Sequence, residues 1–287
     1  MSNDSDLPLA KPEAPPPPAD RAGWLAAMEA RCTEIGYFEP LGARHWAWLH
    51  DDGPNLIVSF ERLQDILARP ERLSFGHGIA APRGWSHLCL ISDGDTWFRD
   101  STLWGYVDRL VDDAFFDDFD RVLFFGSGTG SHAACAYSVA APGAAVLALR
   151  PRATLDPRRA GWDPRHAGLR RMDFTSRYGY APDMVEAARA VWLVLDPFDP
   201  LDAMHGALFH GPNIHVLRTP WLGGRVGPVL ESQNLLAGLA RAACLGKLTT
   251  AGFAGLWRAR RQSPLFLAAL RQAAGKRGRT ITPTPRP

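Results

Sequence analysis

Short apolar runs alternate with amphipathic stretches along most of this sequence, and the alternation predicts secondary structure before any single residue is considered. A run of about five mostly apolar residues bounded by glycine, proline or aspartate is typical of a strand. Apolar residues three or four positions apart are typical of a helix. On these criteria we expect strands at residues 37–41, 45–50, 55–61, 87–92, 121–125, 145–149, 191–195 and 214–218.

Helical spacing separates many of these strands. After residue 85 the strands alternate with helices, which predicts an α/β fold with a central, mostly parallel sheet and helices on both faces. The short strands before that point predict an antiparallel lead-in on one edge. We expect helices at residues 22–35, 103–115, 131–141, 182–189 and 201–209, a helical turn at 63–68, an irregular loop at 71–83, and a helical C-terminal third at 227–274 with breaks at Gly246 and Pro264.

The two ends of the chain differ in composition from the middle. Residues 1–20 are acidic and then proline-rich, which predicts an extended arm without fixed structure. Residues 276–287 are basic and punctuated by proline, which predicts a flexible tail. We therefore expect one domain at residues 21–275, of which residues 227–275 are a helical extension.

Composition and charge narrow the function classes. The chain has 287 residues, 46% of them hydrophobic, and a net charge of only +2, so nothing favours a nucleic-acid partner. Its four cysteines form no C-x-x-C pair, which argues against a metal knuckle or a disulfide framework and fits a reducing compartment. The N-terminus lacks the features of a signal peptide, and the longest apolar stretch is too short to span a bilayer. We expect a cytoplasmic protein without a transmembrane segment, a cofactor or a metal.

The segment Gly126-Ser127-Gly128-Thr129-Gly130 joins a buried strand to a helix. In a parallel sheet this junction lies at the carboxyl ends of the strands, where ligands bind. Free N–H groups at the start of the following helix favour an anion or a developing oxyanion. We therefore expect a binding pocket above the turn, formed by Gly126, Thr129 and Gly130, with His132 and Arg150 beside it.

Two nucleotide-binding interpretations of this turn are open. The turn resembles that of S-adenosylmethionine-dependent methyltransferases, which implies a carboxylate after the next strand to hold the ribose. The next strand ends instead in Arg150, whose side chain cannot accept a hydrogen bond from a ribose. Residues 127–131 are also similar to the pyrophosphate loop of phosphoadenosine phosphosulfate reductases, although the aspartate usual in that loop is absent.

The order of elements over residues 37–240 resembles the α/β-hydrolase family. In that family several strands precede a nucleophile elbow of the form G-x-S-x-G, a strand follows, and acid- and histidine-bearing loops come last. The resemblance implies that residues 126–130 are the elbow and that Asp199, after the strand at 191–195, is the triad acid. It also implies a central sheet of the α/β-hydrolase type with flanking helices and a helical C-terminal extension.

The sequence departs from the hydrolase pattern at two catalytic positions. Gly128 stands at the nucleophile position, and the loop around Trp221, which should carry the triad histidine, has none. Glycine relieves the backbone strain that an elbow serine bears, so Gly128 is expected once catalysis no longer requires the serine. We therefore predict a catalytically degenerate protein that binds a small molecule or a protein. An esterase or acyl-transfer enzyme that uses Ser127 or Ser131 as a displaced nucleophile is the alternative, and a methyltransferase is a third.

Overall fold

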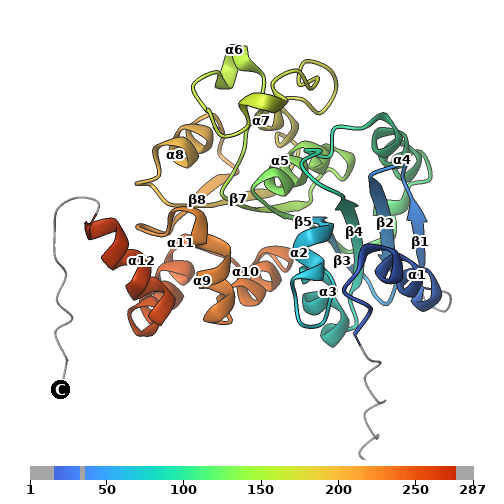
Figure 1. Ribbon diagram of the computed structural model, residues 1–287, viewed down its shortest axis with the longest axis horizontal. Coiled ribbons are helices and arrows are strands. Elements are labelled where there is room, and N and C mark those ends of the chain that lie inside the picture. The colour runs from blue at the N-terminus through green and yellow to red at the C-terminus, as the bar shows by residue number, and fades with distance from the viewer. Residues whose placement is uncertain (1–15, 33–35, 276–287) are drawn as a thin grey trace, which may run out of the picture.

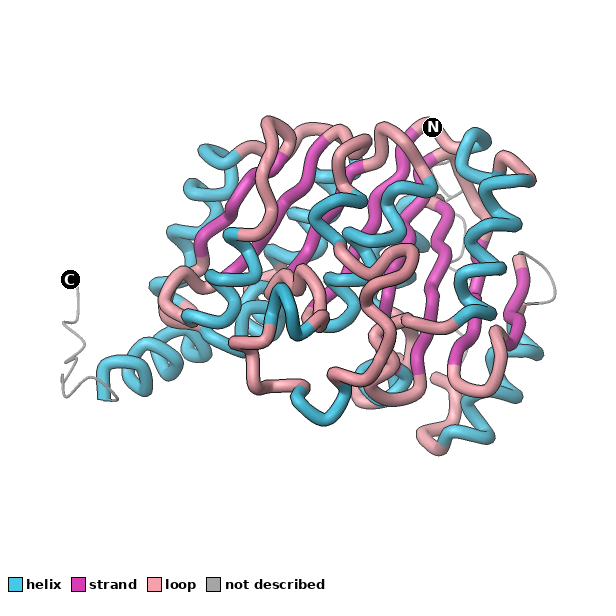
Figure 2. The backbone as a smooth tube through the Cα atoms, turned by 90° about the horizontal axis from the view of Figure 1, so that it is seen from above, coloured by secondary structure: helices cyan, strands magenta, loops and turns pink. Residues whose placement is uncertain are grey.

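The computed structural model describes residues 16–32 and 36–275. Its centre is an eight-stranded sheet in the order β1-β2-β4-β3-β5-β6-β7-β8 (Figures 1 and 2). The first two strands pair antiparallel with their neighbours, whereas the strands from β4 to β8 along this order are mutually parallel. The strands are β1 (Tyr37–Pro40), β2 (His45–His50), β3 (Asn55–Arg62), β4 (Ser86–Ser92), β5 (Arg121–Ser127), β6 (Ala145–Leu149), β7 (Ala190–Leu195) and β8 (Ile214–Arg218).

This sheet confirms the predicted fold class, an α/β fold with a central, mostly parallel sheet and an antiparallel lead-in on one edge. Helices cover both faces. The α-helices are α1 (Arg21–Arg31), α2 (Leu63–Leu67), α3 (Phe75–Ala80), α4 (Ser101–Asp112), α5 (Thr129–Tyr137), α6 (Pro157–Ala160), α7 (Ala181–Met184), α8 (Pro200–Ala207), α9 (Val226–Ser232), α10 (Leu235–Cys244), α11 (Thr250–Leu256) and α12 (Pro264–Gly275).

The largest correction to the predicted elements falls at residues 71–83, where an irregular loop was expected. This segment contains the helix α3, followed by a short 3₁₀ turn at Ala81–Arg83. Two glycines in α3 lower its helix propensity, which is why the sequence pattern missed it. The Ser74 hydroxyl compensates by capping the helix, since it accepts a hydrogen bond from the His77 amide at 3.2 Å.

Two smaller differences concern helix ends. The helix predicted at 182–189 is only one turn, α7, and α5 begins two residues earlier than predicted, directly after Gly128. The helix predicted at 22–35 ends at Arg31, and residues 33–35 lie outside the described residues. Residues 1–15 and 276–287 also lie outside them, so the domain division remains a prediction.

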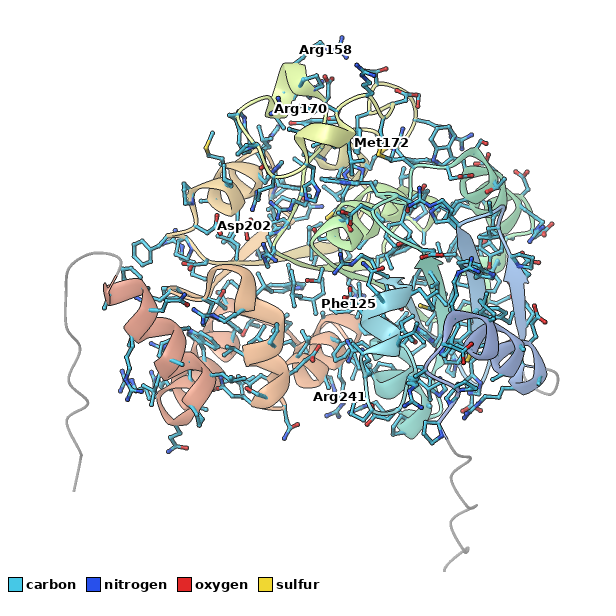
Figure 3. The ribbon with its side chains drawn as sticks, viewed as in Figure 1. Phe125, Arg158, Arg170, Met172, Asp202 and Arg241 are labelled. Carbon is cyan, nitrogen blue, oxygen red and sulfur yellow. The ribbon has the colours of Figure 1, made fainter. Side chains whose placement is uncertain are left out.

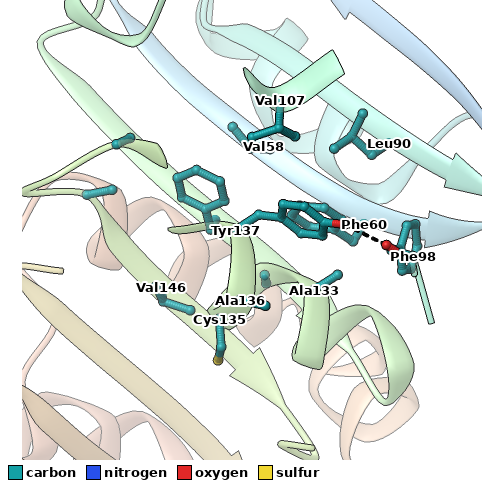
Figure 4. Packing of buried hydrophobic residues seen from close by; sticks show 14 of the residues in the cluster. Val58, Phe60, Leu90, Phe98, Val107, Ala133, Cys135, Ala136, Tyr137 and Val146 are labelled. Carbon is teal, nitrogen blue, oxygen red and sulfur yellow. Dashed lines mark hydrogen bonds between the residues drawn. The ribbon is translucent and has the colours of Figure 1, made fainter. Parts of the chain in front are cut away.

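Side chains of successive strand residues alternate between two hydrophobic layers, as a pleated sheet requires. One layer packs against α4, α5 and α7, and the other against α3 and α9 to α12, which lie on opposite sides of the sheet in Figure 1. In the first layer the Phe60 ring stacks on Tyr137 at 5.5 Å between ring centroids and meets Phe98 edge-on at 5.3 Å (Figure 4). The Tyr137 hydroxyl donates to the Phe98 carbonyl at 2.6 Å, so this buried phenol is fully bonded.

Residues 151–180, here called the cap, connect β6 to α7. In Figure 1 the cap, with α6, lies on the same side of the sheet as α5 and α8. Its inner side is a small apolar cluster in which Trp97 packs against Leu155 and Phe174. The cap, which follows the carboxyl end of β6, has very little regular structure. Among the described residues, no helix is both long and apolar enough to cross a membrane.

Replacing Phe60 by alanine should lower the free energy of unfolding by about 3–5 kcal/mol, because it removes a fully buried ring from the centre of the first layer. Phe198, whose exposed fraction is 48%, is the matched control, and its replacement by alanine should change stability far less. Urea denaturation of both variants measures the difference. Equal losses would mean that Phe60 is not central to the core.

Candidate functional site

The glycine turn lies where the direction of strand addition in the sheet reverses. From β3 the chain moves to β4 on one side, whereas β5 lies on the other side of β3 and is followed outward by β6, β7 and β8. In open α/β sheets, ligands bind outside the carboxyl ends of the strands at such a switch point. The end of β3 and the turn after β5 therefore flank the position where a ligand is expected.

The backbone of the turn is tight at Gly126 and Gly130 and open at Gly128. A Cβ atom on Gly126 would overlap the Gly130 carbonyl, and one on Gly130 would overlap the Phe60 carbonyl of β3. Gly128 has φ 58° and ψ −117°, a left-handed conformation that strains any other residue, yet a Cβ atom there would meet nothing within 4 Å. The turn thus retains the shape that would present a side chain at residue 128, while the residue has no side chain.

The two serines beside Gly128 have different environments. Ser131 is fully buried: its hydroxyl lies 2.6 Å from the Gly128 carbonyl oxygen and accepts from the Arg152 amide at 3.1 Å. These bonds tie the first turn of α5 to the cap. Ser127 is exposed and lines a cavity of about 380 Å³ together with Gly130. We call this the switch-point cavity; its other walls include Phe60, Glu61, Arg62, Arg69, Phe75, Leu149, Pro228 and Glu231.

Asp199 and Trp221 lie together in a different cavity, of about 620 Å³, between the ends of β7 and β8. Asp199 caps α8, because its Oδ1 accepts from the amides of Leu201 and Asp202 at 3.1 Å each. Trp221 has a φ of 72° and stacks on Phe198, with 3.9 Å between ring centroids. The structure thus brings these two predicted site residues together and places Ser127 in another cavity.

Sequence reasoning did not identify Asp196 as a site residue, although it organises the β7–β8 cavity. Its carboxylate accepts hydrogen bonds from three backbone amides, those of Phe198 at 2.9 Å, Trp221 at 3.0 Å and Gly223 at 2.8 Å. Only 3% of Asp196 is exposed. The carboxylate therefore fixes the loop after β8 to the end of β7. Its position at the end of a predicted strand was the only signal in the sequence.

A buried polar cluster anchors the cap beside the turn. Asp202, at the start of α8, accepts from Arg150 at 3.2 Å, from Arg152 at 3.1 Å and from Arg165 of the cap at 2.6 Å. Asp163, also in the cap, pairs with Arg165 at 2.7 Å. Arg150 bends toward this cluster from the end of β6, where its φ is 51°. Three guanidinium groups thus share two carboxylates that are almost completely buried.

His205 belongs to the same cluster as a neutral imidazole. Its Nδ1 accepts from the Ala153 amide at 3.2 Å, so Nε2 carries the proton and donates to Asp163 at 2.9 Å. Burial lowers the pKa of His205, and the bond to Asp163 opposes that shift. The ring is therefore occupied in holding the cap, and neither nitrogen faces the glycine turn.

His132, expected beside the binding pocket, is enclosed under the cap. It is 1% exposed and packs between Trp97 and Phe174, with ring centroids 5.6 and 5.3 Å away. Burial, together with the charge of Arg99, lowers the pKa of His132 to about 3. His132 is thus uncharged at neutral pH, and it lines neither the switch-point cavity nor the β7–β8 cavity.

Comparison with known proteins yields similarity in structure only. No model of a protein family matches the chain, and no curated protein sequence matches it. The fold is similar to an esterase of Pyrobaculum calidifontis, at 12% identity over 78% of this chain and 89% of that one, with a TM-score of 0.47. It is also similar to Est1E of Butyrivibrio proteoclasticus, at 14% identity over 75% of this chain and 99% of that one, with a TM-score of 0.48.

A third similar structure is the capsule O-acetyltransferase of Neisseria meningitidis serogroup A, at 10% identity over 71% of this chain and 94% of that one, with a TM-score of 0.44. Identities this low indicate no substrate or mechanism for this chain.

Substitutions at the three glycines of the turn should separate backbone strain from steric overlap. Gly128→Ser should cost about 1–3 kcal/mol of stability, since its side chain meets open space but its φ is positive. Gly126→Ala and Gly130→Ala should each cost more, because the added Cβ overlaps backbone that cannot move aside. Chemical denaturation of the three variants measures the loss in free energy of unfolding for each. A loss in Gly128→Ser as large as in the other two would contradict the open space around residue 128.

The buried His132 should make stability fall in acid. The imidazole of the unfolded chain has an ordinary pKa of about 6.5, so protons bind the unfolded chain first as the pH falls. The stabilising contribution of the neutral ring is present above about pH 6.5 and is lost as the pH falls toward the folded pKa of about 3. Unfolding free energies measured between pH 7 and pH 4 should fall less steeply in His132→Phe than in the unmodified chain. Parallel curves would exclude this role of His132.

Proposed function

We propose that this chain is an α/β-hydrolase-like protein that binds a ligand at the switch-point cavity and has lost serine-hydrolase catalysis. The proposal rests on the backbone conformation and the missing side chain of residue 128. The turn retains the conformation and the open space that would present a nucleophile, while Gly128 supplies no reactive atom. Without its nucleophile a triad enzyme keeps only about 10³- to 10⁴-fold acceleration from oxyanion stabilisation and binding.

Neighbouring groups do not supply the missing triad. A displaced nucleophile needs a base within hydrogen-bond reach. Ser131 is buried and holds the cap, so a substrate cannot reach its hydroxyl without disrupting the bond to Arg152. Asp199 is committed to capping α8, and Trp221 stands in the loop where the hydrolase pattern has its histidine. These contacts favour the degenerate interpretation over an active esterase.

The switch-point cavity has features suited to binding. Two aromatic residues from different elements, Phe75 and Phe125, contribute to its walls, and such walls bury the apolar part of a small molecule. The Arg69 guanidinium lies over the Phe75 ring at 5.1 Å, and its Nε has no hydrogen-bond partner among the described residues. The exposed Ser127 hydroxyl offers a polar contact that would orient a ligand.

The two alternatives meet specific obstacles. The methyltransferase interpretation needs a carboxylate after β6 to hold a ribose, but Arg150 occupies that position and its Nε donates to Asp202. The displaced-nucleophile interpretation is confined to Ser127, since it is the exposed serine next to Gly128. Substitution of Ser127 therefore tests that alternative.

A fluorophosphonate probe tests the proposal directly. It labels serines activated by a base, so we expect no labelled serine and no hydrolysis of p-nitrophenyl acetate above the background of heat-denatured protein. Mass spectrometry of probe-treated protein and an absorbance assay of ester cleavage measure the two outcomes.

Matched variants determine what a positive result would mean. If the protein is labelled or hydrolyses the ester, Ser127→Ala should be compared with Ser101→Ala, which changes an exposed serine at the start of α4. Loss of activity in Ser127→Ala alone would overturn the proposal and establish the displaced nucleophile. Equal activity in both variants would exclude Ser127 as the source of the hydrolysis.

A further inference from the structure

Three side chains that can bind metals gather on one face of the sheet, and one of them, Glu61, also lines the switch-point cavity. Glu61 is at the end of β3, and His87 and Cys89 are two residues apart on the adjacent parallel strand β4. Residues two apart on a strand point to the same face. One ligand atom from each side chain lies within 4.8 Å of the other two, and all three residues are buried.

Burial raises the free-energy cost of an ionised carboxylate at Glu61. It accepts from the amides of Phe75 at 2.8 Å and Gly76 at 3.1 Å and from the Ser59 hydroxyl at 2.9 Å. Among the described residues, no arginine or lysine lies within ion-pair distance of it. An ionised carboxylate in this position is stabilised by a proton or by a cation.

The other two side chains have the properties of zinc ligands. His87 is fully buried, and an imidazole nitrogen is a common ligand of zinc. Its Nε2 lies 2.9 Å from the Ser59 hydroxyl, and its Nδ1 has no hydrogen-bond partner among the described residues. Cys89 is a free thiol with no exposed surface.

We propose that Glu61, His87 and Cys89 form a structural site for one divalent ion of the zinc type. The mixed oxygen, nitrogen and sulfur donors suit zinc, which prefers four ligands in tetrahedral geometry. Bonds of about 2.0–2.3 Å place tetrahedral ligands roughly 3.3–3.8 Å apart, so the side chains close by roughly 1 Å on binding. The Ser59 oxygen, hydrogen-bonded to both Glu61 and His87, is placed to provide the fourth ligand.

The charges balance when the ion binds. The ion displaces the thiol proton of Cys89, which leaves to solvent, and the resulting thiolate and the Glu61 carboxylate together neutralise the two positive charges. Three buried groups then form one neutral unit that joins β3, β4 and, through the amides bonded to Glu61, the start of α3. Ser74, Phe75 and His77 of the segment covering the cluster also line a cavity of about 570 Å³.

Cobalt substitution of the full-length protein tests the site. Unfolding and refolding in the presence of Co²⁺ should yield one bound ion per chain and a thiolate-to-cobalt charge-transfer band in the near ultraviolet. Cys89→Ser should lose that band and bind the ion at least 10- to 100-fold more weakly, since loss of an outer-shell partner alone costs about that much. Cys135→Ser, which changes a buried cysteine in α5 outside this cluster, should keep both.

Zinc itself provides the second readout. A chelator should lower the melting temperature of the zinc-loaded protein but leave Cys89→Ser unchanged. The proposal is overturned if the folded, unmodified protein retains no ion after gel filtration. It is equally overturned if Cys89→Ser keeps the cobalt band or responds to the chelator as the unmodified protein does. Glu61 also lines the switch-point cavity, but these outcomes report ion binding at Cys89, whereas the fluorophosphonate and ester assays report catalysis, so the two proposals can fail separately.

Discussion

The rest of the site depends on how closely the backbone of the glycine turn approaches its neighbours. Gly126 meets the Gly130 carbonyl and Gly130 meets the Phe60 carbonyl at distances that leave no room for a Cβ atom. This contact seats α5 directly on β3 and β5, and the helix is then buried along nearly its whole length. Because Ser131 on its first turn bonds the cap at Arg152, the same contact also sets where the cap begins.

The charged cluster beneath the cap fixes the position of the rest of the cap. Removing one partner of a buried ion pair typically costs 3–5 kcal/mol, because the other charge is left without compensation. Here Asp202, labelled in Figure 3, accepts hydrogen bonds from Arg150 after β6 and from Arg152 and Arg165 in the cap. One carboxylate thus fixes segments that lie 37 to 52 residues earlier in the sequence. The arrangement gives an irregular segment one fixed position over the sheet, which helices of four residues or fewer would not provide.

The sequence predicted the parts of the molecule that local patterns determine. The apolar runs of β5, β6 and β7 are buried on both faces, so their strands could be located without knowledge of their neighbours. The glycine turn was found for the same reason. The missed features depend on contacts distant in sequence: Asp196 bonds a loop some 25 residues later, and Asp202 and His205 meet Asp163 and Arg165 about 40 residues earlier. The helix α3 was missed because capping outweighs its poor intrinsic propensity.

The antiparallel lead-in has a consequence for how the protein behaves in concentrated solution. A sheet's outermost strand offers unpaired N–H and C=O groups to other chains, and long, flat edges promote aggregation. β1 is that strand on one side; it has only four residues and ends at Pro40, which has no N–H group to donate. A neighbouring molecule thus finds little backbone to pair with there, and the short β1 protects the long apolar strands behind it from sheet-to-sheet association.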